Sequence, residues 1–131
     1  MTDTALPAAP PLRYFVRTIL GCGCPEEVLE HIELEVRPGP PAWRALRVGG
    51  RLLVHVRPAP EPDLAGLEAW LATGVAERDG QGFNRFRLVL VTAEPETLRA
   101  AAEARLAAWG GDDRTHLHVI TEDAAQAVGP A

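Results

Sequence analysis

The 131-residue sequence contains no serine and no lysine, so all thirteen of its cationic side chains are arginine. Serine nucleophiles, lysine Schiff bases and phosphate-binding loops that depend on a lysine are therefore excluded. Cysteine is scarce as well: the chain has two, separated by one residue, which is not the disulfide framework of a small secreted protein. Apart from weak threonine, tyrosine and histidine groups, Cys22 and Cys24 are the only side-chain nucleophiles that remain.

The formal net charge of −5 argues against a general nucleic-acid binder, because phosphate backbones require a basic excess on one face. No apolar run approaches the roughly 20 residues that span a membrane. The first eleven residues have neither an arginine nor the long apolar core of a signal peptide. We therefore expect a cytoplasmic protein that binds neither nucleic acid nor membranes, and whose partner is another protein or a second copy in a homodimer.

The length suits a single domain, since a chain of this size buries roughly two-thirds of its unfolded surface without help from disulfides. Residues 1–11 and 121–131 are rich in alanine, proline and threonine and have no hydrophobic period. We expect both segments to be flexible tails. One α/β domain is predicted between them, at residues 12–120.

Strand-like and helix-like segments alternate along this domain. Leu12–Leu20 is rich in aromatic and β-branched residues, which predicts a first strand. A helix should begin directly after it, with Cys24 as the cap and Pro25 at the first helical position. His31–Val36 fits a continuation of that helix or a separate strand. Further along, the sequence predicts a hairpin of 43–48 and 51–56 around Gly49-Gly50, helices at 63–76 and 95–109, and strands at 85–92 and 117–120.

This order of elements predicts an α/β fold, with α+β as the alternative. We expect a mixed, mostly parallel sheet covered by two or three helices. The β-α-β-β-α-β core, followed by an α-β extension, also matches a ferredoxin-like split unit.

The strongest candidate site is the segment GCGCPEE at residues 21–27. It lies at the carboxyl end of the predicted first strand and the amino end of the next helix, where ligands bind in α/β sheets. The helix dipole stabilises a thiolate there, and Gly21 and Gly23 allow the backbone to turn. Cys22 and Cys24 would then form a strained, exchangeable disulfide, with Cys22 attacking and Cys24 resolving. Alternatively, both thiolates would bind a soft metal such as copper or zinc.

Two families resemble this arrangement. Cys24-x-x-x-Val28 is similar to the second half of the Cys-x-x-Cys-x-x-x-Val pattern of heavy-metal-associated domains, whose cysteines also follow the first strand of a β-α-β-β-α-β unit. That resemblance implies soft-metal binding at Cys22 and Cys24. The placement of the two cysteines also resembles thioredoxin-like proteins, which implies thiol–disulfide exchange. LGCGCP is similar to the glycine-rich turn of dinucleotide-binding folds, but it lacks the third glycine.

Zinc would need two further ligands, and His31 is a candidate for one of them. His116 and His118 would share one face of a strand, but we predict that they are not metal ligands. In the competing interpretation the cysteines only pack a tight turn. The chain is then a non-catalytic interaction or assembly module, with its surface at the sheet face or the segment around Trp43. Whether the protein is an enzyme stays open.

Arginine forks match carboxylates and phosphates, so the arginines suggest a possible anion site. The candidates are Arg47, Arg51, Arg57, Arg85 and Arg87. Solvated positions on sheet edges and faces are the simpler interpretation. The polar segment 78–84 is predicted to be a loop, which would either bind a ligand or only connect two elements.

Overall fold

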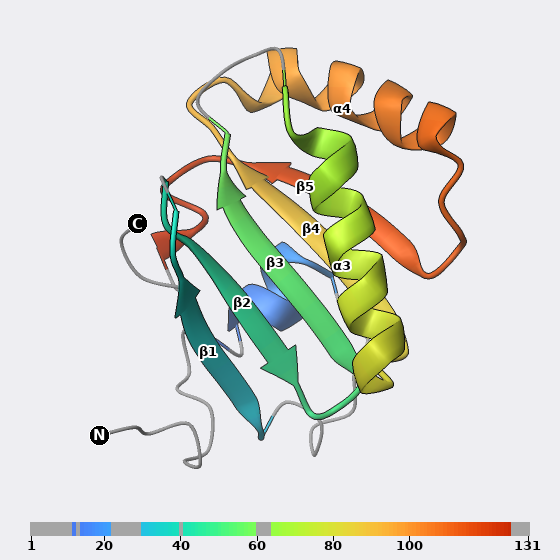
Figure 1. The fold of residues 1–131 in the computed structure, drawn as a ribbon. Helices are drawn as coiled ribbons and strands as arrows, with labels where there is room; N and C mark the ends of the chain where they lie inside the picture. Colours follow the sequence, from blue (N-terminus) through green and yellow to red (C-terminus); the bar gives the residue numbers. More distant parts are fainter. Residues whose placement is uncertain (1–11, 13, 22–29, 40, 60–63, 127–131) are drawn as a thin grey trace.

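The computed structural model describes residues 12, 14–21, 30–39, 41–59 and 64–126. A five-stranded mixed sheet lies at its centre, with the strands in the sequential order β1-β2-β3-β4-β5 (Figure 1). The elements are η1 (Phe15–Ile19), β1 (Ile32–Arg37), β2 (Trp43–Val48), β3 (Leu52–Pro58), α3 (Leu67–Gln81), β4 (Arg85–Val91), α4 (Pro95–Trp109) and β5 (Thr115–Ile120). No helix in these ranges is long and apolar enough to cross a membrane.

The sheet has an antiparallel half and a parallel half. β1, β2 and β3 pair antiparallel, whereas β3, β4 and β5 pair parallel and are connected through α3 and α4. The α/β class is therefore confirmed, but the prediction of a mostly parallel sheet is wrong. Two local features explain the antiparallel half. The Gly49-Gly50 turn has φ values of 58° and 70°, which suit a tight hairpin, and the ambiguous segment His31–Val36 supplies strand β1.

The predicted first strand at Leu12–Leu20 is wrong, because the residues described in this segment form no strand and are helical as far as Ile19. Leu12 and Tyr14 have helical conformation, and Phe15–Ile19 form a π-helical turn. The apolar residues that pack against one core cluster are Leu12, Phe15, Val16, Ile19 and Leu20. Their spacing is that of one helix face, which outweighs the β-branched composition. Without a first strand, the ferredoxin-like order also fails. The helix predicted to begin at Cys24–Pro25 lies outside the described residues.

Two apolar clusters lie on opposite faces of the sheet. α3 and α4 cover one face, while η1 and the turn that contains Ala125 pack on the other (Figure 1). Ala125 belongs to the segment 121–131 and is 7% exposed. Successive strand residues point to opposite faces, so Leu53 of β3 faces the helices and Val54 faces η1. This alternation decides which polar side chains can meet.

α3 lies very close to the sheet and extends further than predicted. A Cβ atom at Gly74 would overlap the ring of Phe86, so only glycine fits there. The helix continues to Gln81, which contradicts the prediction of a loop that begins at Arg78. Arg78 is 1% exposed and donates two hydrogen bonds to the Asp112 carboxylate, at 3.0 and 2.6 Å. The residue therefore ties α3 to the turn before β5.

Candidate functional site

A pocket of about 210 Å³ opens where the β1–β2 connection, the end of β3 and the start of α3 meet. Its lining combines three prolines with two indoles and one guanidinium, from Pro38, Pro41, Pro58, Trp43, Trp70 and Arg57. Its volume is below the roughly 300–1,000 Å³ of pockets that hold drug-sized molecules. The pocket therefore has room for about one side chain.

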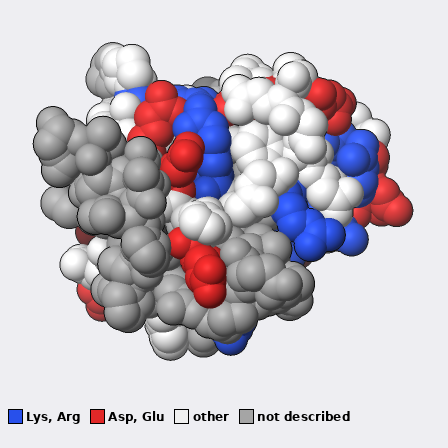
Figure 2. Space-filling model, turned by 90° about the horizontal axis from the view of Figure 1, so that it is seen from below, with Lys and Arg blue, Asp and Glu red and all other residues white. Residues whose placement is uncertain are grey.

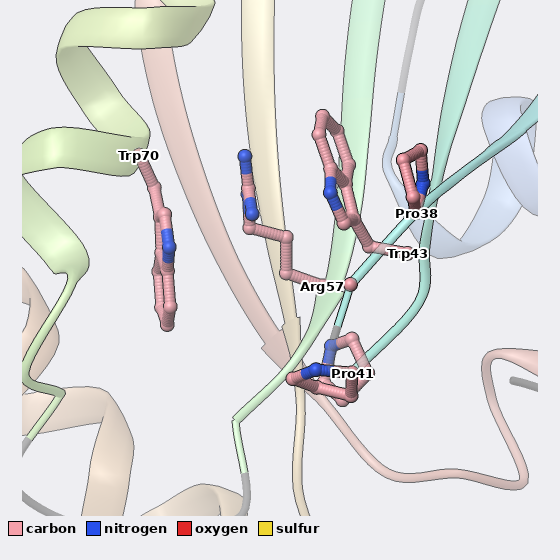
Figure 3. Close-up of a pocket in the computed structure, with 7 residues that line it drawn as sticks. Pro38, Pro41, Trp43, Arg57 and Trp70 are labelled. Carbon is pink, nitrogen blue, oxygen red and sulfur yellow. The ribbon is translucent and has the colours of Figure 1, made fainter.

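Arg57 lies between the two indole rings (Figure 3). Its Cζ atom is 3.6 Å from the ring centroid of Trp43 and 5.3 Å from that of Trp70. Trp43 and Arg57 continue the β2–β3 register one step past the pair Arg44 and Val56, so they stand next to each other on one sheet face. Trp70 comes from the first turn of α3, which covers that face. Cation–π attraction holds the guanidinium in this position.

No carboxylate pairs with Arg57 in the part of the chain that the structure describes. Its Nε atom is buried and has no hydrogen-bond partner. Burial, followed by the positive charge of Arg37, lowers the pKa of Arg57 to about 10. The guanidinium is therefore still protonated at neutral pH, and the indoles cover its two faces.

The neighbouring cation, Arg37, is already paired. Its guanidinium donates to both oxygens of Glu77, at 2.7 and 2.6 Å, and to Glu35 at 3.0 Å. The hydrogen bond from Arg37 is the main reason why the pKa of Glu77 is lowered, and the bond to Glu77 raises the pKa of Arg37. Arg37 also lies 5.1 Å from the ring of Trp43. The charges of Arg37 and Glu77 thus compensate each other, whereas no carboxylate in the described ranges compensates the charge of Arg57.

A buried histidine connects this ion pair to the pocket. His55 is fully buried, with edge contacts to Trp43 at 4.8 Å and to Phe86 at 5.0 Å. Burial is the largest cause that lowers its pKa to about 4, so the ring is neutral. Its Nε2 atom lies 3.0 Å from Glu77 Oε1, and its Nδ1 has no partner. The proton therefore resides on Nε2 and is donated to Glu77.

The five arginines considered for an anion site do not come together. The β3–β4 register places Arg85 and Arg87 on the face of Leu52 and Val54, opposite to Arg57. Arg47 pairs with Glu35 at 3.2 Å, and Arg51 is an exposed turn residue. The period of two along a strand separates Arg85 and Arg87 from Arg57, and of the five arginines only Arg57 lines the pocket.

On the opposite face, the two histidines of β5 lie beside arginines of β4. Arg87 Nη1 is 2.8 Å from His118 Nε2 and donates to the carbonyl of Leu20 at 3.1 Å. Burial, and then Arg87, lower the pKa of His118 to about 4, so the neutral ring accepts this bond. Arg85 lies 3.4 Å from His116 Nε2. These nitrogens face guanidinium groups rather than a position where a cation would fit.

The predicted thiol site cannot be compared with the structure, because Cys22 and Cys24 lie outside the described residues. Gly21, next to them, has a φ of +69°, as expected for a glycine that turns the chain. His31, the proposed additional ligand, is exposed, and its carbonyl accepts a hydrogen bond from Gly49 at 2.7 Å. Within the described ranges no group of three histidine, cysteine or acidic side chains is arranged to hold a metal. The redox and metal assignments stay predictions.

The face of the molecule seen in Figure 2 carries charges of both signs. Figure 2 shows acidic and basic side chains side by side, with no extended area of one sign among the atoms that it describes.

Comparison with known protein families, curated proteins and solved structures finds no match to this chain. Sequence reasoning selected Trp43 and Arg57 but missed Trp70. One signal could have found Trp70. It lies on the predicted helix that follows the strand of Arg57, and that helix has to cover the sheet.

Proposed function

We propose that this chain is a non-catalytic protein-interaction module that binds an anionic group of a partner protein in the Arg57 pocket, formed by Trp43, Arg57 and Trp70 with the surrounding prolines. One observation carries the proposal. A charged, half-buried guanidinium is held between two indoles, and no carboxylate among the described residues pairs with it.

The physical argument starts from the cost of burying a charge. A buried ion is normally paired, since desolvation without compensation is unfavourable. Arg78 follows this rule through Asp112, and Arg37 follows it through Glu77. Arg57 has no such partner within the part of the chain that the structure describes, so an anion from outside would supply it. The two indoles already fix the guanidinium, and little conformational entropy is left to lose on binding.

The size of the pocket favours one side chain of a protein over a free cofactor. A volume of about 210 Å³ is too small for a nucleotide, and a net charge of −5 opposes a nucleic acid. A single anchoring residue gives modest affinity, with a Kd of about 1 mM for an isolated peptide. A full interface would add contacts around this anchor.

The test uses three seven-residue peptides, Gly-Ala-Leu-X-Leu-Ala-Gly, in which X is glutamate, phosphoserine or glutamine. Each titration is monitored by NMR through the indole N–H signals of Trp43 and Trp70, so it measures binding at the pocket itself. We expect at least one of the charged peptides to bind about tenfold more tightly than the glutamine peptide. Arg57→Met should abolish this difference because it removes the charge but keeps an apolar side chain.

Arg51→Met is the matched control, since it removes one positive charge from an exposed turn remote from the pocket lining. This variant should bind the charged peptides like the unmodified protein. Equal binding of all three peptides, or full binding by Arg57→Met, would refute the proposal. Free acetate provides a further comparison. If acetate binds as tightly as the best charged peptide, the pocket is a site for small anions and not for a protein.

The thiol site at Cys22 and Cys24 is a second candidate, acting in redox exchange or in binding zinc or copper. Two observations nearby favour it. Gly21 has the left-handed conformation that a turn into the Cys-Gly-Cys segment uses. The carbonyl of Leu20, two residues before Cys22, is bound by the Arg87 guanidinium, and a neighbouring positive charge lowers the pKa of a thiol.

Its test is a titration of thiol reactivity against pH, together with metal analysis, on protein purified without oxygen. A reactive thiol with a pKa well below about 8.5, or one bound metal per chain, would support the site. Ordinary reactivity, no metal, and unchanged partner binding in a Cys22→Ala/Cys24→Ala double variant would refute it.

A further inference from the structure

We infer that the anion recognised by the Arg57 pocket is a carboxylate, the side chain of a glutamate or aspartate on the partner protein, and not a phosphate monoester. The inference rests on the proposed function and adds the chemical class of the ligand. Three independent properties of the pocket support it: its shape, its charge and the chemistry of its walls.

The shape of the slot favours a planar group. Trp43 and Trp70 cover the two faces of the guanidinium (Figure 3), so a ligand can reach only the N–H groups at its edge. A carboxylate accepts two parallel hydrogen bonds in the plane of an arginine fork. A tetrahedral phosphate projects oxygens above and below that plane, toward the rings. The slot therefore accommodates the flat anion better.

The charge of the site matches a single negative charge. Arg57 contributes one positive charge that no described carboxylate pairs with, and Arg37, whose charge acts on Arg57, is bound by Glu77 and Glu35. His55 adds no charge because burial keeps it neutral. A carboxylate would balance Arg57. A phosphate monoester carries about −1.5 to −2 near neutral pH, so it would introduce excess negative charge beside Glu77.

The pocket walls suit the aliphatic stem of an acidic residue. Pro38, Pro41 and Pro58 present ring carbons, and the indoles present their faces and edges. Among the described residues, the lining side chains include no hydroxyl and no second guanidinium, which a phosphate would need for its additional oxygens. A carboxylate needs only the two donors of one fork. The methylene groups that precede it would contact proline and tryptophan carbons.

The experiment compares the glutamate and phosphoserine peptides defined above, again followed by the indole N–H signals. We expect the glutamate peptide to bind about tenfold more tightly than the phosphoserine peptide. Arg57→Lys should weaken binding of the glutamate peptide about tenfold, because a lysine keeps the charge but has no planar fork. The glutamine peptide measures the contribution of the uncharged scaffold.

The outcomes separate the two proposals. If the phosphoserine peptide binds as tightly as the glutamate peptide or more tightly, and Arg57→Met abolishes that binding, the carboxylate inference is wrong and the anion-binding function stands. Unchanged binding of the glutamate peptide by Arg57→Lys would also overturn the inference, since a point charge would then suffice. If neither charged peptide binds better than glutamine, both proposals fail.

Discussion

Arg78 and Arg57 are two buried or half-buried arginines on the same side of the sheet, and they are satisfied in different ways. Arg78 donates to Asp112, Asp79 and Thr115 and is completely buried. Arg57 has two indoles, and no carboxylate in the described ranges pairs with it. The first is a structural connection between α3 and the turn before β5. The second holds a charge between two rings with no hydrogen-bond partner among the described residues, and this is the arrangement on which the proposed recognition site rests.

The largest loss of stability is expected when the carboxylate partner of Arg78 is removed. Asp112→Ala would leave the buried guanidinium with Asp79 and Thr115 only. We expect the free energy of unfolding to fall by about 3 kcal/mol, at the lower end for a broken buried pair because Asp112 is 40% exposed. Urea unfolding measures this change. A loss below about 1 kcal/mol would show that the pair behaves like a surface ion pair.

Glu77→Gln would bring Arg37, which also lies beside Trp43, closer to the situation of Arg57, because among the described residues only Glu35 would remain as its carboxylate partner. The variant loses the ionised acceptor of Arg37 and His55, so stability should fall by about 2 kcal/mol. Removing one negative charge near the pocket should tighten binding of the glutamate peptide roughly threefold. Denaturation and peptide titration on the same sample check both effects. Weaker binding would indicate that Glu77 supports the pocket mainly by holding its shape.

The pH dependence of stability tests the neutral histidines on the two faces. His55 and His118 have folded pKa values of about 4, below the unfolded value of about 6.5. Their contribution is therefore fully present above pH 6.5 and is lost as the pH falls toward 4. Each adds a slope of up to about 1.4 kcal/mol per pH unit in that window. His55→Gln should remove the contribution of His55 to the change of unfolding free energy with pH. Urea unfolding at pH 7, 6 and 5 measures this change. An unchanged slope would mean that folding does not shift the pKa of His55.

The smallest effect is expected for Arg57 itself. Arg57→Met loses cation–π attraction of about 1 kcal/mol and also removes an unpaired charge from a partly desolvated position. These terms oppose each other, so stability should change by less than about 1 kcal/mol while peptide binding disappears. Thermal and urea unfolding of this variant, beside Asp112→Ala, make the comparison direct. A loss as large as that of Asp112→Ala would make Arg57 a structural residue.

Local signals in the sequence predicted the elements that depend on them. The Gly49-Gly50 turn gave the hairpin, and Pro95 and Gly110 marked the two ends of α4. Leu12–Leu20 was misread because its residues suit a strand by composition and a helix by spacing. Local signals could not predict the order of the strands in the sheet, since β3, β4 and β5 pair across long crossovers.

The candidate site was predicted only in part, for the same reason. Arg57 and the segment around Trp43 stood out by residue type, but their neighbours were assigned wrongly. Trp70 reaches Arg57 because α3 crosses back over β3. The separation of Arg57 from Arg87 follows from which sheet face each residue occupies. Neither relation is encoded in a short stretch of sequence.

The contact between Gly74 and Phe86 has a consequence for the outer surface. Trp70 stands one turn before Gly74 on α3, so the depth at which this helix rests on β4 also sets the position of Trp70 opposite Arg57. A methyl group at residue 74 would push the helix away from the sheet, and the slot would become wider. Gly74 therefore acts as a spacer: an interior position without a side chain sets the width of an opening at the surface.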